Sequence, residues 1–522
     1  MSKVPNNYRR ILFSYFFLFI PVVFYLLTVS KEIGLPDSAI LIDAMASHTV
    51  SSHVCSHNLS NIIGWLFLKF LPSANTAFKA NLFSAACGSA AVSFFYFMLL
   101  QAGLRPPLAS LCSSIFMVSH SMWWHSTHVE NYALNLLFFH CCVLLVYRDM
   151  RKVQKENKPN APEDKYLKFL LFIAALSIFN HVQNAAFLLA AFIYFLRRLK
   201  YCPLSLPKIF TILIYPVIGL IPYLITLTYD YLHHGKNVLS WASGGAFHEW
   251  FSLANFFMGI KEFSNLLFLQ FPSLFLLFVF SGILRIIFGF FKRQREQYSP
   301  TPDFFIIPVF IISLAVFLNY KAWDLFSFYL PVFSVLAFYG SISAHSLAEK
   351  FPKMRCVVLL ILASGILMPP FIYNNISKWT DDKDGYWGKR YYAIKQQYRY
   401  RYDLVAELTN PFFRDPNNSI AAFSKKLLSS LPANSMFIDD VSTYHQLLYY
   451  QNHTGLRKDI DLILIQPVGF EGWGIPLAEI IKIILMQTEE KRFFVVTDTG
   501  VCADLINQMY GFGWSYTPFA IS

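Results

Sequence analysis

Long apolar runs constrain this chain more than any other feature. Runs of about 18 or more apolar residues recur through the first 375 positions, and each is long enough to cross a bilayer as a helix. Only 14% of the 522 residues are charged, against roughly 25% in a soluble domain. We therefore predict a polytopic α-helical membrane protein with about eleven transmembrane helices, at 11–29, 81–101, 107–122, 131–147, 167–181, 184–197, 208–228, 263–290, 303–319, 326–346 and 356–374.

The basic residues predict which side of the membrane each loop faces. They cluster before the first crossing and after the fourth, sixth, eighth and tenth, at positions such as Arg9, Arg151, Arg198, Arg293 and Lys353. With a cytoplasmic N-terminus, all these loops are cytoplasmic, as the positive-inside rule requires. The net charge of +12 is then a sign of topology and predicts no nucleic-acid partner.

The stretch "NHVQN" at 180–184 interrupts the apolar segment from Tyr166 to Leu199. Two short helices meet there, or one long helix carries a polar break. The agreement of all basic loops with one topology favours two crossings.

The tail from 375 to 522 has a different character, with mixed charge and turn signals. Short strand-like runs, "SMFID", "DLILIQ" and "RFFVVTD", alternate with helical stretches, which predicts a small extramembrane α/β domain. The predicted domains are a transmembrane domain at 1–374, with a first outer loop at 30–80, and the α/β domain at 375–522.

Asp37 lies in the outer loop that follows the first crossing. It is either a solvated or helix-capping acid, or a functional carboxylate. The next residues are amphipathic, and such a helix would lie along the membrane surface. It would hold Asp37 in a fixed place at the mouth of the helix bundle.

Histidines and an acid gather in the outer segments. The turn "SHSMWWHSTHVEN" contains His120, His125, His128 and Glu130, and His53 and His57 precede it. Their spacing fits no standard metal site, so we predict no metal; hydrogen bonding to a phosphate or a sugar suits them as well. Glu130 has the alternative of a favourable helix-dipole contact, and at least one of Trp123 and Trp124 suits an interfacial aromatic belt.

Two further polar residues lie in or beside crossings. His181 sits in the middle of an apolar segment, where a polar group needs a partner or a water-filled cavity; a structural bond to a neighbouring helix is the alternative. Asp324 in "NYKAWDLFSFYLP" either caps the following helix or pairs with Lys321.

The order and spacing of these sequence segments resemble those of a family within the GT-C glycosyltransferase superfamily, the protein O-mannosyltransferase-like proteins. The family's D-S-G-E-L block is similar to the stretch at Asp37, its next histidine to His53, and its R-V-N-L-L-S-A block to the stretch at Asn81. Further blocks resemble Trp124 with Glu130 to Asn135, Asn180-His181, Trp241, and Asp324 to Pro331. The chain departs from the family at Ile40, where the family has glutamate, and at "VCSHN", where the family has P-P-G-Y-P.

The resemblance implies a fold, a reaction and a set of partners. GT-C enzymes take sugars from lipid-phosphate donors on the outer face of the membrane. We therefore expect transfer of a hexose, mannose first, from a polyprenyl- or dolichyl-phosphate donor to a hydroxyl of a protein Ser/Thr or a glycan, in a bacterial inner membrane or the endoplasmic reticulum. No cofactor is implied beyond the lipid-linked donor, and the reaction would be inverting.

The same resemblance implies roles for the residues. Asp37 would be the general base. The expected substrate-binding residues are His53, His128, Glu130, Asn180, His181, Trp241, Lys321 and Asp324. His53, His128 and Lys321, with Lys236 as a further candidate, would stabilise the leaving phosphate, and Glu130 and His181 would shape the sugar pocket.

A different class of function remains open. The loss of the family glutamate at Ile40 favours a non-catalytic lipid-sugar transporter or a decayed GT-C scaffold. A transporter needs functional polar groups on both faces and at mid-membrane, whereas the candidates here gather on one face, which favours the enzyme.

Overall fold

The computed structural model describes residues 6–48, 57–72, 75–156, 164–234, 252–293, 301–320, 324–398, 401–439, 443–465, 475–486 and 493–495. Contacts divide the chain into two compact units. The first unit comprises Met1–Val29, His48–Phe67 and Leu82–Tyr373, and the second comprises Ser30–Ser47, Leu68–Asn81 and Asn374–Ser522. The segments Ser30–Ser47 and Leu68–Asn81 thus group with the C-terminal residues, whereas the predicted boundaries placed them in the transmembrane domain.

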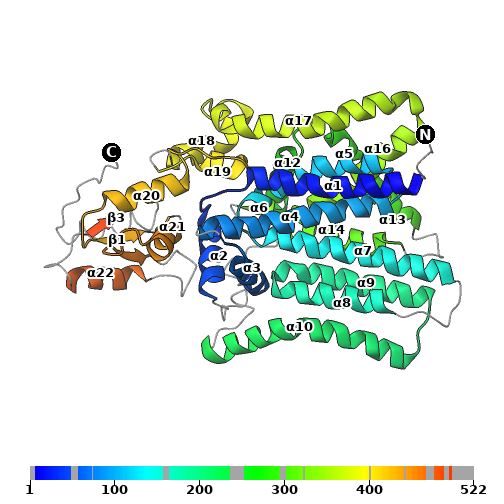
Figure 1. Ribbon diagram of the computed structural model, residues 1–522, viewed down its shortest axis with the longest axis horizontal. Coiled ribbons are helices and arrows are strands. Elements are labelled where there is room, and N and C mark those ends of the chain that lie inside the picture. Colours follow the sequence, from blue (N-terminus) through cyan, green and yellow to red (C-terminus); the bar gives the residue numbers. More distant parts are fainter. Residues whose placement is uncertain are drawn as a thin grey trace. The chain divides into compact units, whose positions relative to one another are not determined.

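The first unit is a bundle of helices, many of which run side by side (Figure 1). Its α-helices are α1 (Asn6–Thr28), α3 (Asn58–Phe70), α4 (Thr76–Gln101), α5 (Pro106–Met117), α6 (His120–Thr127), α7 (Tyr132–Glu156), α8 (Lys165–Leu176), α9 (Ala185–Tyr201), α10 (Leu206–His234), α12 (Leu253–Gln270), α13 (Leu276–Arg293), α14 (Asp303–Phe317), α15 (Leu325–Phe328), α16 (Leu330–Lys350) and α17 (Arg355–Trp379); α3, α4 and α17 each cross a unit boundary. Short 3₁₀ turns are η1 (Ser177–Phe179), η2 (Val182–Asn184) and η4 (Pro352–Met354).

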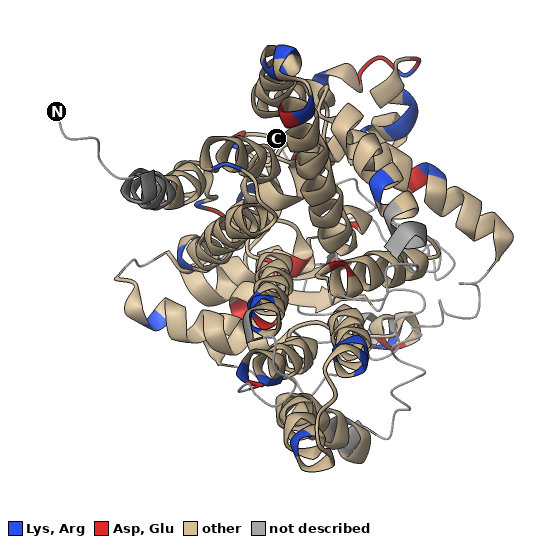
Figure 2. Ribbon diagram, turned by 90° about the vertical axis from the view of Figure 1, so that its right-hand side faces the viewer, with Lys and Arg blue, Asp and Glu red and all other residues tan. Residues whose placement is uncertain are grey.

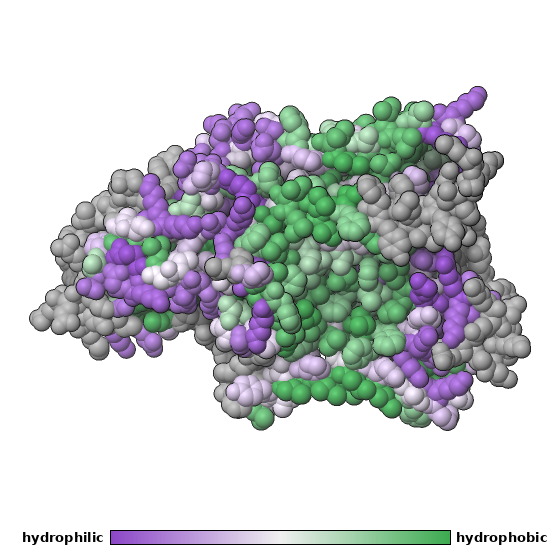
Figure 3. All heavy atoms as spheres, in the orientation of Figure 1, coloured by the Kyte–Doolittle hydropathy of each residue, from purple (hydrophilic) through white to green (hydrophobic). Residues whose placement is uncertain are grey.

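The protein is an integral membrane protein. Within the described residues, six helices are long and apolar enough to cross a membrane, and four further apolar helices are shorter. A hydrophobic surface covers the sides of the long helices (Figure 3). Figure 2 marks the Lys and Arg positions in blue on the ribbon, viewed from the right-hand side of Figure 1; basic residues beside crossings are expected near the helix ends. The number of crossings and the cytoplasmic N-terminus stay predictions.

The segment from Tyr166 to Leu199 forms two helices. α8 ends at Leu176, the turn η1 directly precedes "NHVQN", η2 covers its last three residues, and α9 begins at Ala185. The two helices pack against each other, and α8 also packs against α10. The segment therefore consists of two helices that meet, and not of one long helix with a polar break.

The apolar run at 263–290, predicted as one crossing, is not one continuous helix. It is shared between α12 and α13, which are separated at Phe271–Phe275. Pro272 explains the break, because proline disfavours helical backbone at the preceding residue. Phe271 accordingly leaves the helical region, with φ −131° and ψ 66°.

Arg198 is buried, although the sequence suggested a basic loop residue. Its guanidinium lies 3.4 Å from Asp149 and 3.8 Å from Asp164, and the side chain has no exposed surface. Tyr194 donates a hydrogen bond to the same Asp149 carboxylate at 2.8 Å. A buried charge requires such partners, and the network ties α7 to α9.

Helices α13 and α16 approach closely at two glycines. A Cβ on Gly282 would lie 2.8 Å from the backbone nitrogen of Gly340. Small residues at a helix interface let backbones approach in this way. We expect Gly282→Val to destabilise the fold by about 1–3 kcal/mol, because the helices must separate. Ser281→Val, at the exposed neighbouring position, is the control; equal melting temperatures for the two variants in detergent would contradict this account.

The second unit contains a three-stranded parallel sheet in the order β2-β1-β3. The strands are β1 (Met436–Asp439), β2 (Asp461–Leu464) and β3 (Phe493–Val495), and they lie within the three runs predicted as strands. All four residues of β1 are buried, as suits the central strand of a parallel sheet. The helices of this unit are α2 (Pro36–Ser47), α18 (Tyr386–Tyr398), α19 (Leu404–Thr409), α20 (Ile420–Ser430), α21 (Tyr444–Tyr449), the π-helix η5 (Tyr450–Thr454) and α22 (Leu477–Met486).

Candidate active site

Asp37 occupies the first turn of α2, directly after Pro36. Proline suits the first helical position because its missing N–H needs no partner there. The backbone nitrogens of Ser38 and Ala39 both donate to the carbonyl of Leu35. Asp37 therefore follows the helix start rather than capping it, and its negative charge is favourable near the positive end of the helix dipole.

The Asp37 carboxyl has an unusual proton affinity. The side chain is exposed, yet the protein atoms around it desolvate the carboxylate and raise its pKa from the ordinary 3.8 to about 6. A carboxylate with such a pKa is still ionised near neutral pH and is a stronger base than an ordinary aspartate.

Four asparagines of the first unit form a buried network. The side-chain oxygen of Asn135 accepts hydrogen bonds from Nδ2 of Asn180 at 2.5 Å and from Nδ2 of Asn184 at 2.8 Å. Nδ2 of Asn135 donates to Asn131 at 2.9 Å. All four side chains are buried. The network fixes the break between α8 and α9 against the first turn of α7.

Two histidines stack beside this network. Nδ1 of His57 donates to the backbone carbonyl of Asn180 at 3.1 Å. The rings of His57 and His181 are nearly parallel, with centroids 5.0 Å apart. Tyr132 and Phe328 surround His181, at centroid distances of 5.4 and 5.8 Å.

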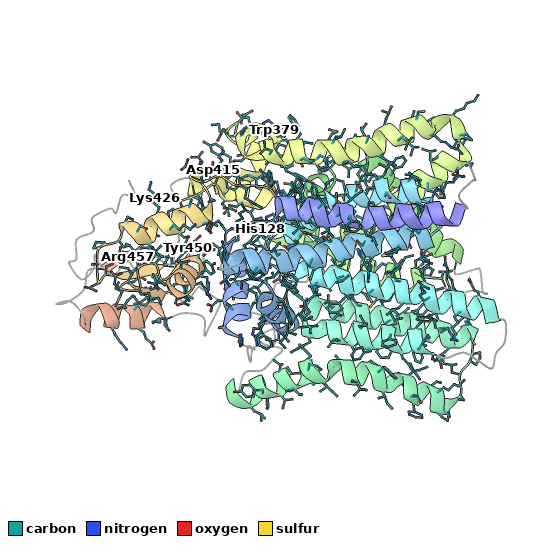
Figure 4. The ribbon with its side chains drawn as sticks, viewed as in Figure 1. His128, Trp379, Asp415, Lys426, Tyr450 and Arg457 are labelled. Atoms are coloured by element: carbon teal, nitrogen blue, oxygen red, sulfur yellow. The ribbon has the colours of Figure 1, made fainter. Side chains whose placement is uncertain are left out.

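The aromatic contacts continue to α6 and α15. His125 packs against Tyr132 at 4.8 Å and against Phe326 at 5.6 Å. The ring of His128, labelled in Figure 4, stacks on Trp124 at 5.1 Å. The cluster of His57, His125, His128, Tyr132, Asn180, His181, Phe326 and Phe328 is called the histidine–asparagine cluster below.

The structure brings together part of the predicted site. His128, Asn180 and His181 belong to the cluster. Glu130 is close to the cluster in the sequence, since it lies two residues after His128 and directly before Asn131. Asp324 directly precedes α15, which carries Phe326 and Phe328. Asp37 lies in the second unit. The predicted residues His53, Lys236, Trp241 and Lys321 lie outside the described residues.

The structure bears on three alternatives raised by the sequence, and it decides the one that concerns the tryptophans. The Asp324 side chain does not cap α15. Trp123 and Trp124 are both buried, at 5% and 2% exposure, so neither belongs to an exposed aromatic belt. Glu130 is buried just before α7, where its backbone N–H donates to the Ser84 hydroxyl at 3.3 Å.

Sequence reasoning missed the asparagine network as a unit. The signal was present: Asn131 and Asn135 are four residues apart, and so are Asn180 and Asn184. Residues at this spacing share one face of a helix, which applies to the start of α7 but not to the break that holds Asn180 and Asn184. Sequence reasoning placed Ser84 and Asn135 within family blocks but assigned them no role. It matched His53, rather than His57, to the family histidine.

Comparison with solved structures gives the class of this fold. The crystal structure of ArnT from Cupriavidus metallidurans bound to undecaprenyl phosphate matches with a TM-score of 0.54 and 12% identity, over 87% of this chain and 86% of that chain. The apo crystal structure of the same ArnT matches with a TM-score of 0.54 and 11% identity, over 93% of each chain. The chain has the GT-C fold of these proteins.

Part of the sequence also matches the model of one protein family. Residues 37–203 match the model described as the protein O-mannosyl-transferase TMEM260 N-terminal domain, which covers less than half of the chain. The match begins at Asp37 and includes the histidine–asparagine cluster as far as His181. It confirms the protein O-mannosyltransferase-like resemblance inferred from the sequence.

Proposed function

We propose that this protein is a GT-C glycosyltransferase that moves a hexose, with mannose the first candidate, from a polyprenyl- or dolichyl-phosphate donor to a hydroxyl acceptor. Protein serine or threonine is the expected acceptor, and the outer face of the membrane the expected site. The TMEM260 N-terminal family model and the ArnT fold support this class. One of the two ArnT structures is bound to undecaprenyl phosphate, which supports a polyprenyl-phosphate lipid as the donor carrier here.

One observation carries the proposal: Asp37 presents an exposed carboxyl in the first turn of α2, at the residue where the family model begins, and the protein atoms around it raise its pKa to about 6. Its carboxylate would accept the proton of the acceptor hydroxyl. The hydroxyl oxygen then bonds to the anomeric carbon while the bond from that carbon to the phosphate oxygen breaks. The bonding electrons leave with the lipid phosphate, which is already anionic and needs no strong acid. A direct displacement of this kind inverts the anomeric configuration.

The other candidates would act on the donor. His53, His128 and Lys321 are proposed to stabilise charge that develops on the leaving phosphate. Glu130, Asn180, His181, Trp241 and Asp324 are proposed to line the sugar pocket. Apart from His128, the histidine–asparagine cluster consists of the Asn180 amide and the rings of three histidines, Tyr132, Phe326 and Phe328, and such groups suit sugar hydroxyls and sugar faces.

Purified protein supplied with a radiolabelled polyprenyl-phosphate hexose tests the proposal. Its own membranes serve as the acceptor source, and mannose and glucose donors are run in parallel. We expect transfer of label to protein that depends on the enzyme. Absence of transfer from either donor would instead favour the lipid-sugar transporter or decayed scaffold, for which Ile40 in place of the family glutamate is the sequence argument.

The reaction should depend on pH. Asp37 must be ionised to accept a proton, and its pKa of about 6 lies above the ordinary 3.8. The transfer rate should therefore rise as the pH increases through about 6 and level off above it. Single-turnover rates between about pH 5 and pH 8 would measure this; a rate that falls over this range would contradict a carboxylate base.

A further inference from the structure

The segment that carries Asp37 is bonded to the C-terminal residues of its own unit. Nε2 of His453 in η5 lies 3.0 Å from Oδ1 of Asp43, on α2. Helix α2 also packs directly against α21. About 400 residues separate Asp43 from His453 in the sequence, so this contact joins the two ends of the unit.

The chain just before α2 is anchored by the same helices. The Glu32 carboxylate accepts from Lys425 Nζ at 2.8 Å and from the Tyr450 hydroxyl at 3.2 Å. Nε2 of Gln446 donates to the carbonyl of Gly34 at 3.3 Å. Tyr450 lies near the end of α21 (Figure 4). Asp37 is thus flanked on both sides along the chain by contacts to α20, α21 and η5.

A second set of contacts holds the same segment from residues 75–81. Nδ2 of Asn81, which is fully buried, donates to the carbonyls of Ser30 and Glu32, both at 2.9 Å. The hydroxyl of Tyr449 accepts from the backbone nitrogen of Ala77 at 3.2 Å. Residues 75–81 therefore connect the start of the Asp37 segment with α21.

The Asp37 carboxylate itself makes no hydrogen bond or ion pair with another described residue. Its location therefore depends on the placement of α2. A displacement of about 1 Å in a reacting group can lower a rate about a hundredfold, so the groups that place α2 bear on catalysis without touching the substrate.

We propose that Asp43 and His453 are positioning residues: they lock the Asp37 helix onto α21 and η5, so that the C-terminal part of the chain is required for activity. The predicted effect on transfer rate rests on the proposed function, whereas the predicted placement of α2 does not. The matched family model ends at residue 203, so the C-terminal half of this contact lies outside the region that defines the likeness.

The test measures helix placement and transfer separately on the full-length protein in nanodiscs. Amide hydrogen exchange of residues 37–47 reports local opening of α2. Asp43→Ala and His453→Ala should each speed this exchange roughly ten- to a hundredfold, the range for loss of a hydrogen bond to a charged group. Each should lower kcat by a similar factor and leave the KM for the lipid donor nearly unchanged.

Two further variants sharpen the result. Asp43→Asn keeps an oxygen that can accept the His453 N–H, so it should restore most of the wild-type exchange and rate. Asp381→Ala is the matched control, because Asp381 pairs with Lys395 at 3.0 Å in the same unit and contacts neither α2 nor α21 through a described bond. The double variant Asp43→Ala with His453→Ala should be no worse than either single variant.

Each outcome has one meaning. Unchanged exchange in both single variants overturns the lock, and faster exchange with wild-type kcat overturns the positioning role. Strictly additive effects in the double variant show that the two residues act separately, which also overturns the lock. Failure of the wild type to transfer any hexose overturns the proposed function alone, and the lock is then judged on exchange.

Discussion

Replacement of Asp37 by asparagine is expected to lower the rate of hexose transfer ~10²–10⁴-fold, the usual contribution of a positioned general base. Asparagine has nearly the same shape as aspartate but cannot accept the proton of the acceptor hydroxyl. Because the Asp37 carboxylate bonds to no other described residue, the substitution should leave the melting temperature and the affinity for the lipid donor unchanged. The assay is transfer from the radiolabelled donor, with donor binding measured separately.

Asp381→Asn is the control for this substitution. It removes a carboxylate from the same unit, and its partner Lys395 also contacts Asp403. We expect it to keep the wild-type rate. If Asp37→Asn keeps that rate too, Asp37 has no part in the chemistry.

Replacement of Asn135 by alanine is expected to give the largest loss of stability. The Asn135 side-chain oxygen accepts one N–H from Asn180 and one from Asn184, so its removal leaves one buried N–H of each amide unpaired, while the Nδ2 groups still donate to the carbonyls of Asn131 and Ser177. Each unpaired group costs about 1–3 kcal/mol. Thermal unfolding of the purified protein in detergent would measure the loss, and transfer should fall with it because His181 adjoins Asn180.

Asn319→Ala serves as the comparison for Asn135→Ala. Nδ2 of Asn319 makes one bond, 3.2 Å long, to the carbonyl of Ala315 in the preceding turn of its own chain segment. Its loss should change the melting temperature little. Similar losses for the two variants would show that the asparagine network has no special role in holding α7 to the break between α8 and α9.

The membrane fold could be predicted because hydrophobic length is a local property. Apolar runs located nearly every long helix, and "NHVQN" correctly marked the break between α8 and α9. Pro272 was equally visible, but an uninterrupted apolar composition at 263–290 concealed the end of α12. The three strands of the second unit were predictable from their short apolar runs, since β1 to β3 lie within them.

The candidate site was only partly predictable. Motif order pointed to Asp37, His128, Asn180 and His181, but sequence spacing carries no information on contacts between distant segments. The bond between Asp43 and His453 is such a contact. The burial of Arg198 is another, because its two acidic partners lie on α7 and immediately before α8.

The pH dependence of single-turnover transfer, measured on wild type and on Asp37→Asn, tests the central claim most directly. Glu407 has a pKa raised to about 7 by burial, so a pH-dependent wild-type rate alone does not identify the responsible carboxyl. We predict that the wild-type rate rises through about pH 6 and that the small residual rate of Asp37→Asn does not change with pH over the same range. The same rise in both proteins would contradict the assignment of Asp37 as the base.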